Sequence, residues 1–174
     1  MTNQYRCATL KEDMRLAWLQ HVYWTRLLIV SITERLDDQQ ETTARLLQNP
    51  KDIAAIFARF YSCKAANEID RLLTEHLTIG AGLITASRDG DKEKASELDH
   101  QWYLNADQMA KMFHWINPCY NYCELRKMLF VHLDLTKKQV GARLAKNHKE
   151  EIETFGMIEK EALMMADEFV LGIM

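Results

Sequence analysis

Residues 10–36 read LKEDMRLAWLQHVYWTRLLIVSITERL, and this stretch decides the fold class. Its core-facing positions recur in alternating steps of four and three residues: Met14, Trp18, His21, Thr25, Leu28 and Ile32. Such steps keep side chains on one side of an α-helix, which has about 3.6 residues per turn. The stretch is therefore predicted to be a long amphipathic helix that ends near the Asp37-Asp38 pair.

The same spacing recurs along the rest of the chain. Further helices are predicted over residues 40–61, 64–87, 91–116, 122–147 and 149–174. Pro50 should interrupt the first of these, because proline lacks a backbone N–H and fits only the first turn of a helix. The clearest turn signal, Asp89-Gly90-Asp91, separates the helices predicted over 64–87 and 91–116.

These helices predict a single all-α domain over residues 1–174, folded as an antiparallel bundle. The chain has only 6 glycines and 2 prolines, which disfavours a β-sheet protein with its frequent turns. Five of the predicted helices have about 25 residues, or about 37 Å each. Short connections make such helices antiparallel neighbours. We expect four long helices around the core, in a ferritin- or hemerythrin-like architecture, with one or two additional helices packed outside.

Each long helix carries a polar residue near the middle of its apolar face. These residues are His21, His76, Asn105, His132 and Glu159. Each lies within about two positions of its helix centre, or roughly 3 Å along the axis. Because reversing a helix leaves its centre in place, the five side chains are predicted to converge in one layer of the bundle. Burying imidazole or carboxylate groups is costly unless partners compensate.

A divalent transition metal ion would compensate for this cost. The predicted metal ligands are His21, His76, His132 and Glu159. Three imidazoles and a carboxylate suit zinc, iron, manganese or nickel, and helical bundles hold such ions between facing helices. Candidates to orient the imidazoles are Gln139, Glu75 and Asn105, and candidates to exclude water are Trp18, Trp24 and Trp102.

Two readings without a metal stay open. In the first, the polar layer is a hydrogen-bonded network that fixes the register of the bundle, which then acts as an interaction or self-association module. In the second, the layer lines a pocket for a small organic ligand. The paired E-x-x-H motif of di-iron bundles is absent, since its single copy, Glu97 to His100, falls off the apolar face. No nucleotide-binding or nucleophile motif occurs, so the sequence assigns no catalytic residue.

Charge and composition narrow the range of partners. The net charge is −3 with acids and bases interspersed, so nucleic acid is not an expected partner. We expect no membrane association and a cytoplasmic location, because the chain lacks a long apolar run and a signal peptide. The four cysteines, Cys7, Cys63, Cys119 and Cys123, have no C-x-x-C spacing, which fits a reduced protein. A homodimer is an open expectation, because the apolar last helix could be buried within one chain or between two.

Several short segments resemble a group of small helical proteins of Bacillus- and Clostridium-type bacteria. They are AWLQHVYWTR at 17–26, LLQN at 46–49, EHL at 75–77, HLDLT at 132–136 and LMMAD at 163–167. The resemblance extends over most of the chain and implies a helical, cytoplasmic protein. The group has no established activity, so the resemblance implies no function.

Two of the group's recurring patterns, W-x-x-H-x-x-W-T-R and H-L-D-L-T, match this chain at His21 and His132. The group carries a glutamate where this chain has Gln139, and histidines where it has Glu159 and Glu161, so the number of ligands differs. Some members are labelled acetylglutamate kinase. That label does not suit this chain, because an amino-acid kinase needs an α/β sheet and glycine-rich phosphate loops.

Overall fold

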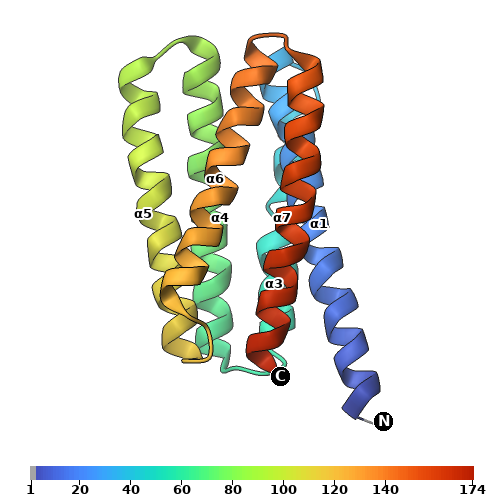
Figure 1. Cartoon of the computed structure of the whole chain (residues 1–174). Coiled ribbons are helices and arrows are strands. Elements are labelled where there is room, and N and C mark those ends of the chain that lie inside the picture. Colours follow the sequence, from blue (N-terminus) through green and yellow to red (C-terminus); the bar gives the residue numbers. More distant parts are fainter. Residues whose placement is uncertain (1–2) are drawn as a thin grey trace.

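The computed structural model describes residues 3–174, with side chains from residue 8 onward. Seven helices account for most of these residues (Figure 1). They are α1 (Asn3–Glu34), α2 (Gln39–Leu46), α3 (Asn49–Phe57), α4 (Cys63–Asp89), α5 (Lys92–Ile116), α6 (Tyr122–Leu144) and α7 (His148–Ile173). No strand occurs in the described part of the chain, and the predicted all-helical class is confirmed.

Five long helices, rather than the predicted four, form the body of the bundle. They run up and down, and α1, α4, α5, α6 and α7 pack in circular order, with α7 returning to α1 (Figure 1). The short helices α2 and α3 pack against α1, and α3 also packs against α4. The described helices therefore form an all-α bundle of five long helices with two short additions, and the predicted four-helix, ferritin-like arrangement is not confirmed.

The interruption predicted at Pro50 within residues 40–61 is confirmed, since this segment forms two helices. Helix α2 ends at Leu46, and Pro50 occupies the first turn of α3. Proline is accommodated there because the first amides of a helix have no intrahelical acceptor. The break matters for the site, since it places Asn49 at the start of α3 with its side chain fully buried.

Polar caps fix where the long helices begin. Ser62, Asp91, Asn121 and Asn147 each accept a hydrogen bond from a backbone N–H in the first turn of the helix that follows. Such a side chain replaces the acceptor that the first turn lacks. Gly90 ends α4 in the left-handed region, with φ of 75°, which glycine adopts without steric cost. These fixed ends set the level at which each helix centre lies.

The apolar core has two parts, and the histidines lie near their boundary. The larger cluster includes Trp18 and Leu133, and the smaller includes Leu28 and Val140. His21 on α1 and His132 on α6 lie close to where the first cluster gives way to the second. The polar layer thus interrupts a core that is otherwise continuous along the bundle.

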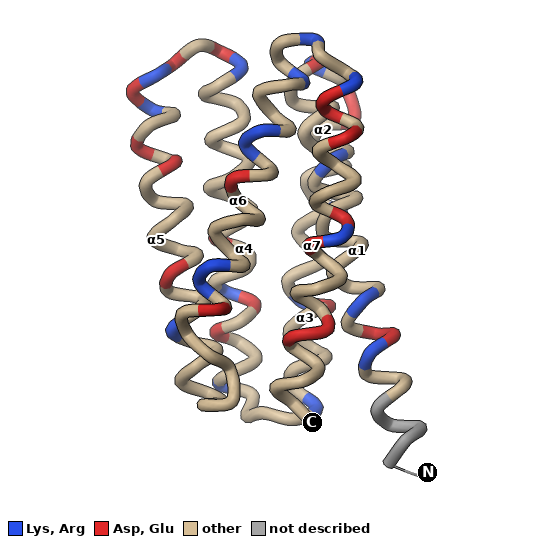
Figure 2. The backbone as a smooth tube through the Cα atoms, in the orientation of Figure 1, with Lys and Arg blue, Asp and Glu red and all other residues tan. Residues whose placement is uncertain are grey.

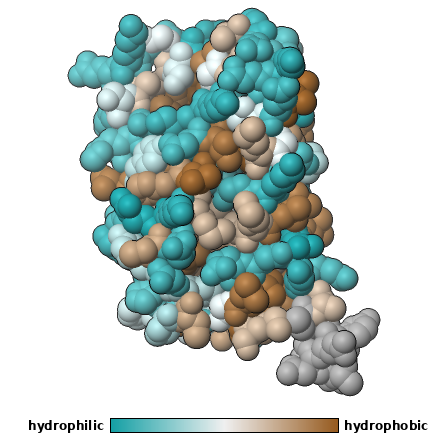
Figure 3. All heavy atoms as spheres, in the orientation of Figure 1, coloured by the Kyte–Doolittle hydropathy of each residue, from teal (hydrophilic) through white to brown (hydrophobic). Residues whose placement is uncertain are grey.

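The surface carries mixed charge and scattered apolar side chains. Lys and Arg alternate with Asp and Glu along the helices (Figure 2). In the view of Figure 3, hydrophobic residues lie among hydrophilic ones. None of the helices in residues 3–174 combines the length and the apolar character that crossing a membrane requires.

Within the described side chains, Cys63, Cys119 and Cys123 are exposed free thiols, and Cys7 lies outside them.

Candidate metal centre

Three histidines from three helices meet inside the bundle. His21 on α1, His76 on α4 and His132 on α6 are 2%, 3% and 4% exposed. One ring nitrogen from each lies within 4.8 Å of one from each of the others. The His21 ring centroid is 6.3 Å from that of His76 and 5.8 Å from that of His132. The predicted convergence of the three imidazoles at one level is confirmed.

The His21 ring is held by the helix break at Pro50. Its Nδ1 lies 2.9 Å from Asn49 Oδ1, and Asn49 Nδ2 donates to the carbonyl oxygen of Ala17 at 2.8 Å. The donation from Nδ2 fixes the amide with its oxygen toward the ring. An oxygen acceptor facing Nδ1 requires a proton on Nδ1, so Nε2 of the neutral ring is unprotonated.

The His76 ring is held in the same way by α5. Its Nδ1 lies 3.2 Å from Asn105 Oδ1, while Asn105 Nδ2 donates to the carbonyl oxygen of Leu72 at 3.1 Å and to Glu75 at 3.3 Å. The indole of Trp102 stacks on the ring with centroids 5.1 Å apart and donates to the carbonyl oxygen of His76. The neutral ring therefore also carries its proton on Nδ1. The predicted partnership of Asn105 with the histidines is confirmed.

Trp102 reaches His76 because of a glycine on the facing helix. A Cβ atom at Gly80 would lie 3.1 Å from the Trp102 ring, closer than most Cβ contacts. The glycine therefore lets α4 and α5 approach at this level. Trp18, 5.5 Å from the His21 ring, covers the site from α1. The third tryptophan proposed as a wall, Trp24, is not part of it, because it packs with Arg45 and the smaller apolar cluster.

The His132 ring is held by a carboxylate from α7. His132 Nδ1 lies 2.8 Å from Glu161 Oε2, and both side chains are buried. The carboxylate accepts a hydrogen bond from the Nδ1–H group, as in the carboxylate–histidine pairs that surround many bound metals. The predicted ligand on α7, Glu159, lies outside the histidine group. Its half-buried side chain accepts a hydrogen bond from Tyr23.

His21 and His76 resist protonation. Burial, together with the charge that His132 would carry, lowers the pKa of His21 to about 4, despite the hydrogen bond to Asn49. Burial and the two neighbouring rings lower the pKa of His76 well below its usual range. His21 and His76 are therefore neutral at pH 7. None of the hydrogen bonds within the described residues uses an Nε2 atom of the three rings.

A small cavity lies among the three rings. Its volume is about 20 Å³, and its lining includes His21, His76, His132, Thr25, Thr136 and Trp102. Both threonine hydroxyls donate to the backbone carbonyl four residues earlier rather than to a ring. A cavity of this size holds one water or one ion. It is too small for an organic ligand, so the pocket reading does not apply to this cavity.

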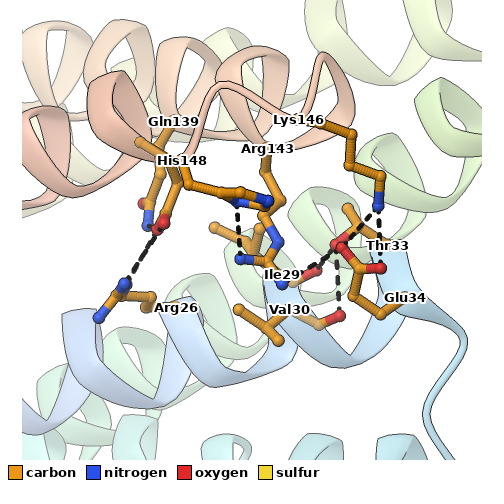
Figure 4. A network of polar contacts seen from close by, with 10 residues as sticks. Arg26, Ile29, Val30, Thr33, Glu34, Gln139, Arg143, Lys146 and His148 are labelled. Carbon is orange, nitrogen blue, oxygen red and sulfur yellow. Dashed lines mark hydrogen bonds and ion pairs between the residues drawn. The ribbon is translucent and has the colours of Figure 1, made fainter.

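A second buried polar group lies two helical turns from the histidines along α6. Gln139, a predicted orienting residue, donates to Glu151 at 3.0 Å and does not contact a histidine. Arg26 approaches the same carboxylate from α1, at 2.9 Å and 3.3 Å (Figure 4). Burial alone would raise the pKa of Glu151, but the hydrogen bonds from Arg26 and Gln139 outweigh it and lower the pKa. This group is a buried ion pair without histidine.

The remaining histidines play no part in the site. His100, His114 and His148 are exposed. The single E-x-x-H motif, Glu97 to His100, therefore lies on a solvated face of α5, as its position off the apolar face predicts.

Comparison of the chain with known protein families, curated proteins and solved structures found no match in any of the three.

Proposed function

We propose that this protein binds one divalent transition metal ion through the Nε2 atoms of His21, His76 and His132. The observation that carries the proposal is the common orientation of the rings. Each Nδ1 is bonded to an oxygen outside the group, and one nitrogen of each ring lies within 4.8 Å of the others. Nitrogens bound to zinc at about 2.1 Å in tetrahedral geometry are about 3.4 Å apart, which is within this limit.

The ring orientation favours a metal over a metal-free network. Three Nε2 lone pairs in one cavity are three acceptors without a donor. A neutral ring that donates through Nδ1 cannot also donate through Nε2, and the low pKa values of His21 and His76 keep these two rings neutral. A water in the cavity donates at most two hydrogen bonds and leaves one acceptor unpaired. A cation engages all three lone pairs at once.

The ligand set narrows the choice of ion. With Glu159 outside the group, the three ligands are all imidazoles. Imidazole suits zinc, iron, nickel and copper, whereas manganese prefers sites rich in carboxylates. Of the four ions predicted from the sequence, we therefore favour zinc, iron or nickel over manganese. Asn49, Asn105 and Glu161 would orient the rings and raise their basicity.

Three protein ligands leave a position on the ion for another molecule. Catalytic zinc sites have this form, whereas structural zinc sites use four protein ligands. An ion held this way supplies a Lewis acid that polarises a bound oxygen and lowers the pKa of bound water. An enzymatic role that uses this open position is the function that we favour, ahead of a metal-free interaction module.

Metal analysis of protein purified without an affinity tag tests the proposal. The protein, after equilibration with zinc and dialysis, should contain one zinc per chain. His21→Ala and His132→Ala should each lose this zinc while remaining folded by circular dichroism. His100→Ala, which removes an exposed histidine, is the matched control and should retain it. Absence of bound zinc, iron and nickel in the unaltered protein, or full binding by His132→Ala, would overturn the proposal.

A further inference from the structure

A larger pocket lies directly against the histidine cavity. Its volume is about 170 Å³, and it lies between α4, α5 and α6. The principal lining residues are Leu83, Ile84, Trp102, Thr136, Val140 and Leu144. The proposed metal site makes no use of this pocket, which is more than eight times larger than the cavity among the rings.

The two spaces adjoin and have three lining residues in common. Ile84, Trp102 and Thr136 line both the pocket and the histidine cavity. Each of the three comes from a different helix, α4, α5 or α6. A molecule in the pocket therefore contacts the same side chains that enclose the open position of the ion.

The pocket is apolar at its floor and polar at its rim. Leu83, Ile84 and Val140 are buried, whereas Gly141 is exposed. Lys137 also lines the pocket, but its ammonium lies 2.6 Å from Asp99, and the side chain packs on the Tyr103 ring. Its charge is therefore already compensated within the chain. Such a lining selects for apolar surface, with few polar groups to fix orientation.

We propose that this pocket binds the apolar part of a small organic substrate whose single oxygen donor takes the open position on the ion. This proposal rests on the proposed function, because the metal ion would bind the oxygen donor. The pocket would select the apolar part of the substrate. A cavity of about 150 Å³ lined by aliphatic and aromatic side chains binds benzene. The apolar part of the substrate is thus about the size of one aromatic ring or a short branched chain.

The pocket can be tested without any metal. Benzene added to the metal-free protein should shift the methyl NMR signals of Leu83 and Val140, with saturation. Gly141→Phe should weaken this binding at least tenfold. Gly141 lines the pocket and is exposed, and a Cβ atom there meets nothing within 4 Å, so a side chain at this position begins in open space beside the pocket. Gly156→Phe, at an equally unobstructed glycine on α7, is the matched control and should leave benzene binding unchanged.

The link to the ion is tested with cobalt(II) in place of zinc. Benzoate should change the visible spectrum of the cobalt protein at concentrations at least tenfold lower than acetate does. Gly141→Phe should abolish this preference and leave the response to acetate unchanged. Equal affinity for the two acids, or no saturable benzene binding, would overturn the substrate proposal. Failure to take up cobalt would instead count against the metal site. Benzene binding to the metal-free protein would still show whether the pocket holds an apolar molecule.

Discussion

Glu161 Oε2 accepts a hydrogen bond from His132 Nδ1 at 2.8 Å, and both side chains are buried. The other carboxylate oxygen, Oε1, is buried and has no partner among the described residues. A buried carboxylate that makes so few hydrogen bonds is costly. A cation bound to Nε2 of His132 would offset that cost. The negative carboxylate at Nδ1 and the positive ion at Nε2 then lie on opposite sides of one ring and attract each other.

Replacing this carboxylate should weaken metal binding without removing a ligand. We expect Glu161→Gln to lower zinc affinity by about 10–100-fold, the usual effect of losing a group that orients a metal-binding histidine. Glu159→Gln, two residues away on α7, is the control and should bind zinc as the unaltered protein does. Competition with a chromogenic zinc chelator measures the zinc affinity of both variants. An equal loss in the two variants would contradict the assignment of Glu161.

The metal-free protein should lose stability as the pH falls from 7.5 to 5. The pKa of His21 is about 4 in the folded chain and about 6.5 when unfolded, so the unfolded chain binds the proton more readily. The stability is present above pH 6.5 and is lost as the pH falls toward 4. For His21 alone the loss at pH 5 is about 2 kcal/mol, and His76 adds to it in the same direction.

Urea denaturation in the presence of a chelator measures this effect. His21→Asn should reduce the difference between pH 7.5 and pH 5, whereas His100→Asn should not, because His100 is exposed. A free energy of unfolding that does not change between these two pH values would mean that His21 and His76 titrate normally. The neutral state of these two rings, which the metal site uses, would then be wrong.

The ion pair between Arg26 and Glu151 should be costly to break from one side. Arg26→Met leaves a buried carboxylate with only Gln139 as a partner, and we expect a loss of about 3 kcal/mol in the free energy of unfolding. The double variant Arg26→Met with Glu151→Met should recover most of this loss, because no buried charge remains. Chemical denaturation of the single and double variants tests the expectation. A double variant less stable than Arg26→Met would contradict it.

A glycine near the end of α7 should tolerate no side chain. A Cβ atom at Gly172 would lie 1.9 Å from Tyr120 Cε1. Tyr120 is fully buried and donates to the Phe169 carbonyl oxygen, so its ring has little room to move. We expect Gly172→Ala to destabilise the protein by about 1–3 kcal/mol. Gly156→Ala, with nothing within 4 Å, should be neutral or stabilise by up to about 1 kcal/mol, as thermal denaturation would show.

The helices and the level of the histidines could be predicted because both depend on local pattern. Helical periodicity and turn signals are short-range, and helix centres align in any antiparallel bundle. Pro50 marked the break between α2 and α3 for the same local reason. The sequence pattern was therefore sufficient to bring His21, His76 and His132 together.

The carboxylate on α7 could not be predicted because apolar residues surround that helix. Ile152, Met157 and Met164 are exposed, so the period of the apolar residues did not fix which side faces the core. Glu159 was therefore predicted as the residue that faces the core, although the buried face includes Glu161, two residues and about 200° away around the helix.

The partner of His21 was missed for a different reason. Asn49 lies at a helix break, outside every long helix, and its burial depends on how α3 packs against α1 and α4. The apolar pocket beside the site was missed as well, since it arises from the spacing of three helices. Neither feature is visible in a pattern confined to one helix.

The protonation of the imidazole rings is the most direct test of the site. Nitrogen-15 NMR of the metal-free protein at pH 7.5 distinguishes a proton on Nδ1 from one on Nε2. We predict that His21, His76 and His132 each carry a proton on Nδ1, and that all three Nε2 signals move when one equivalent of zinc is added. A proton on Nε2 of any of the three rings, or zinc that leaves these signals unchanged, would contradict a metal site built on these histidines.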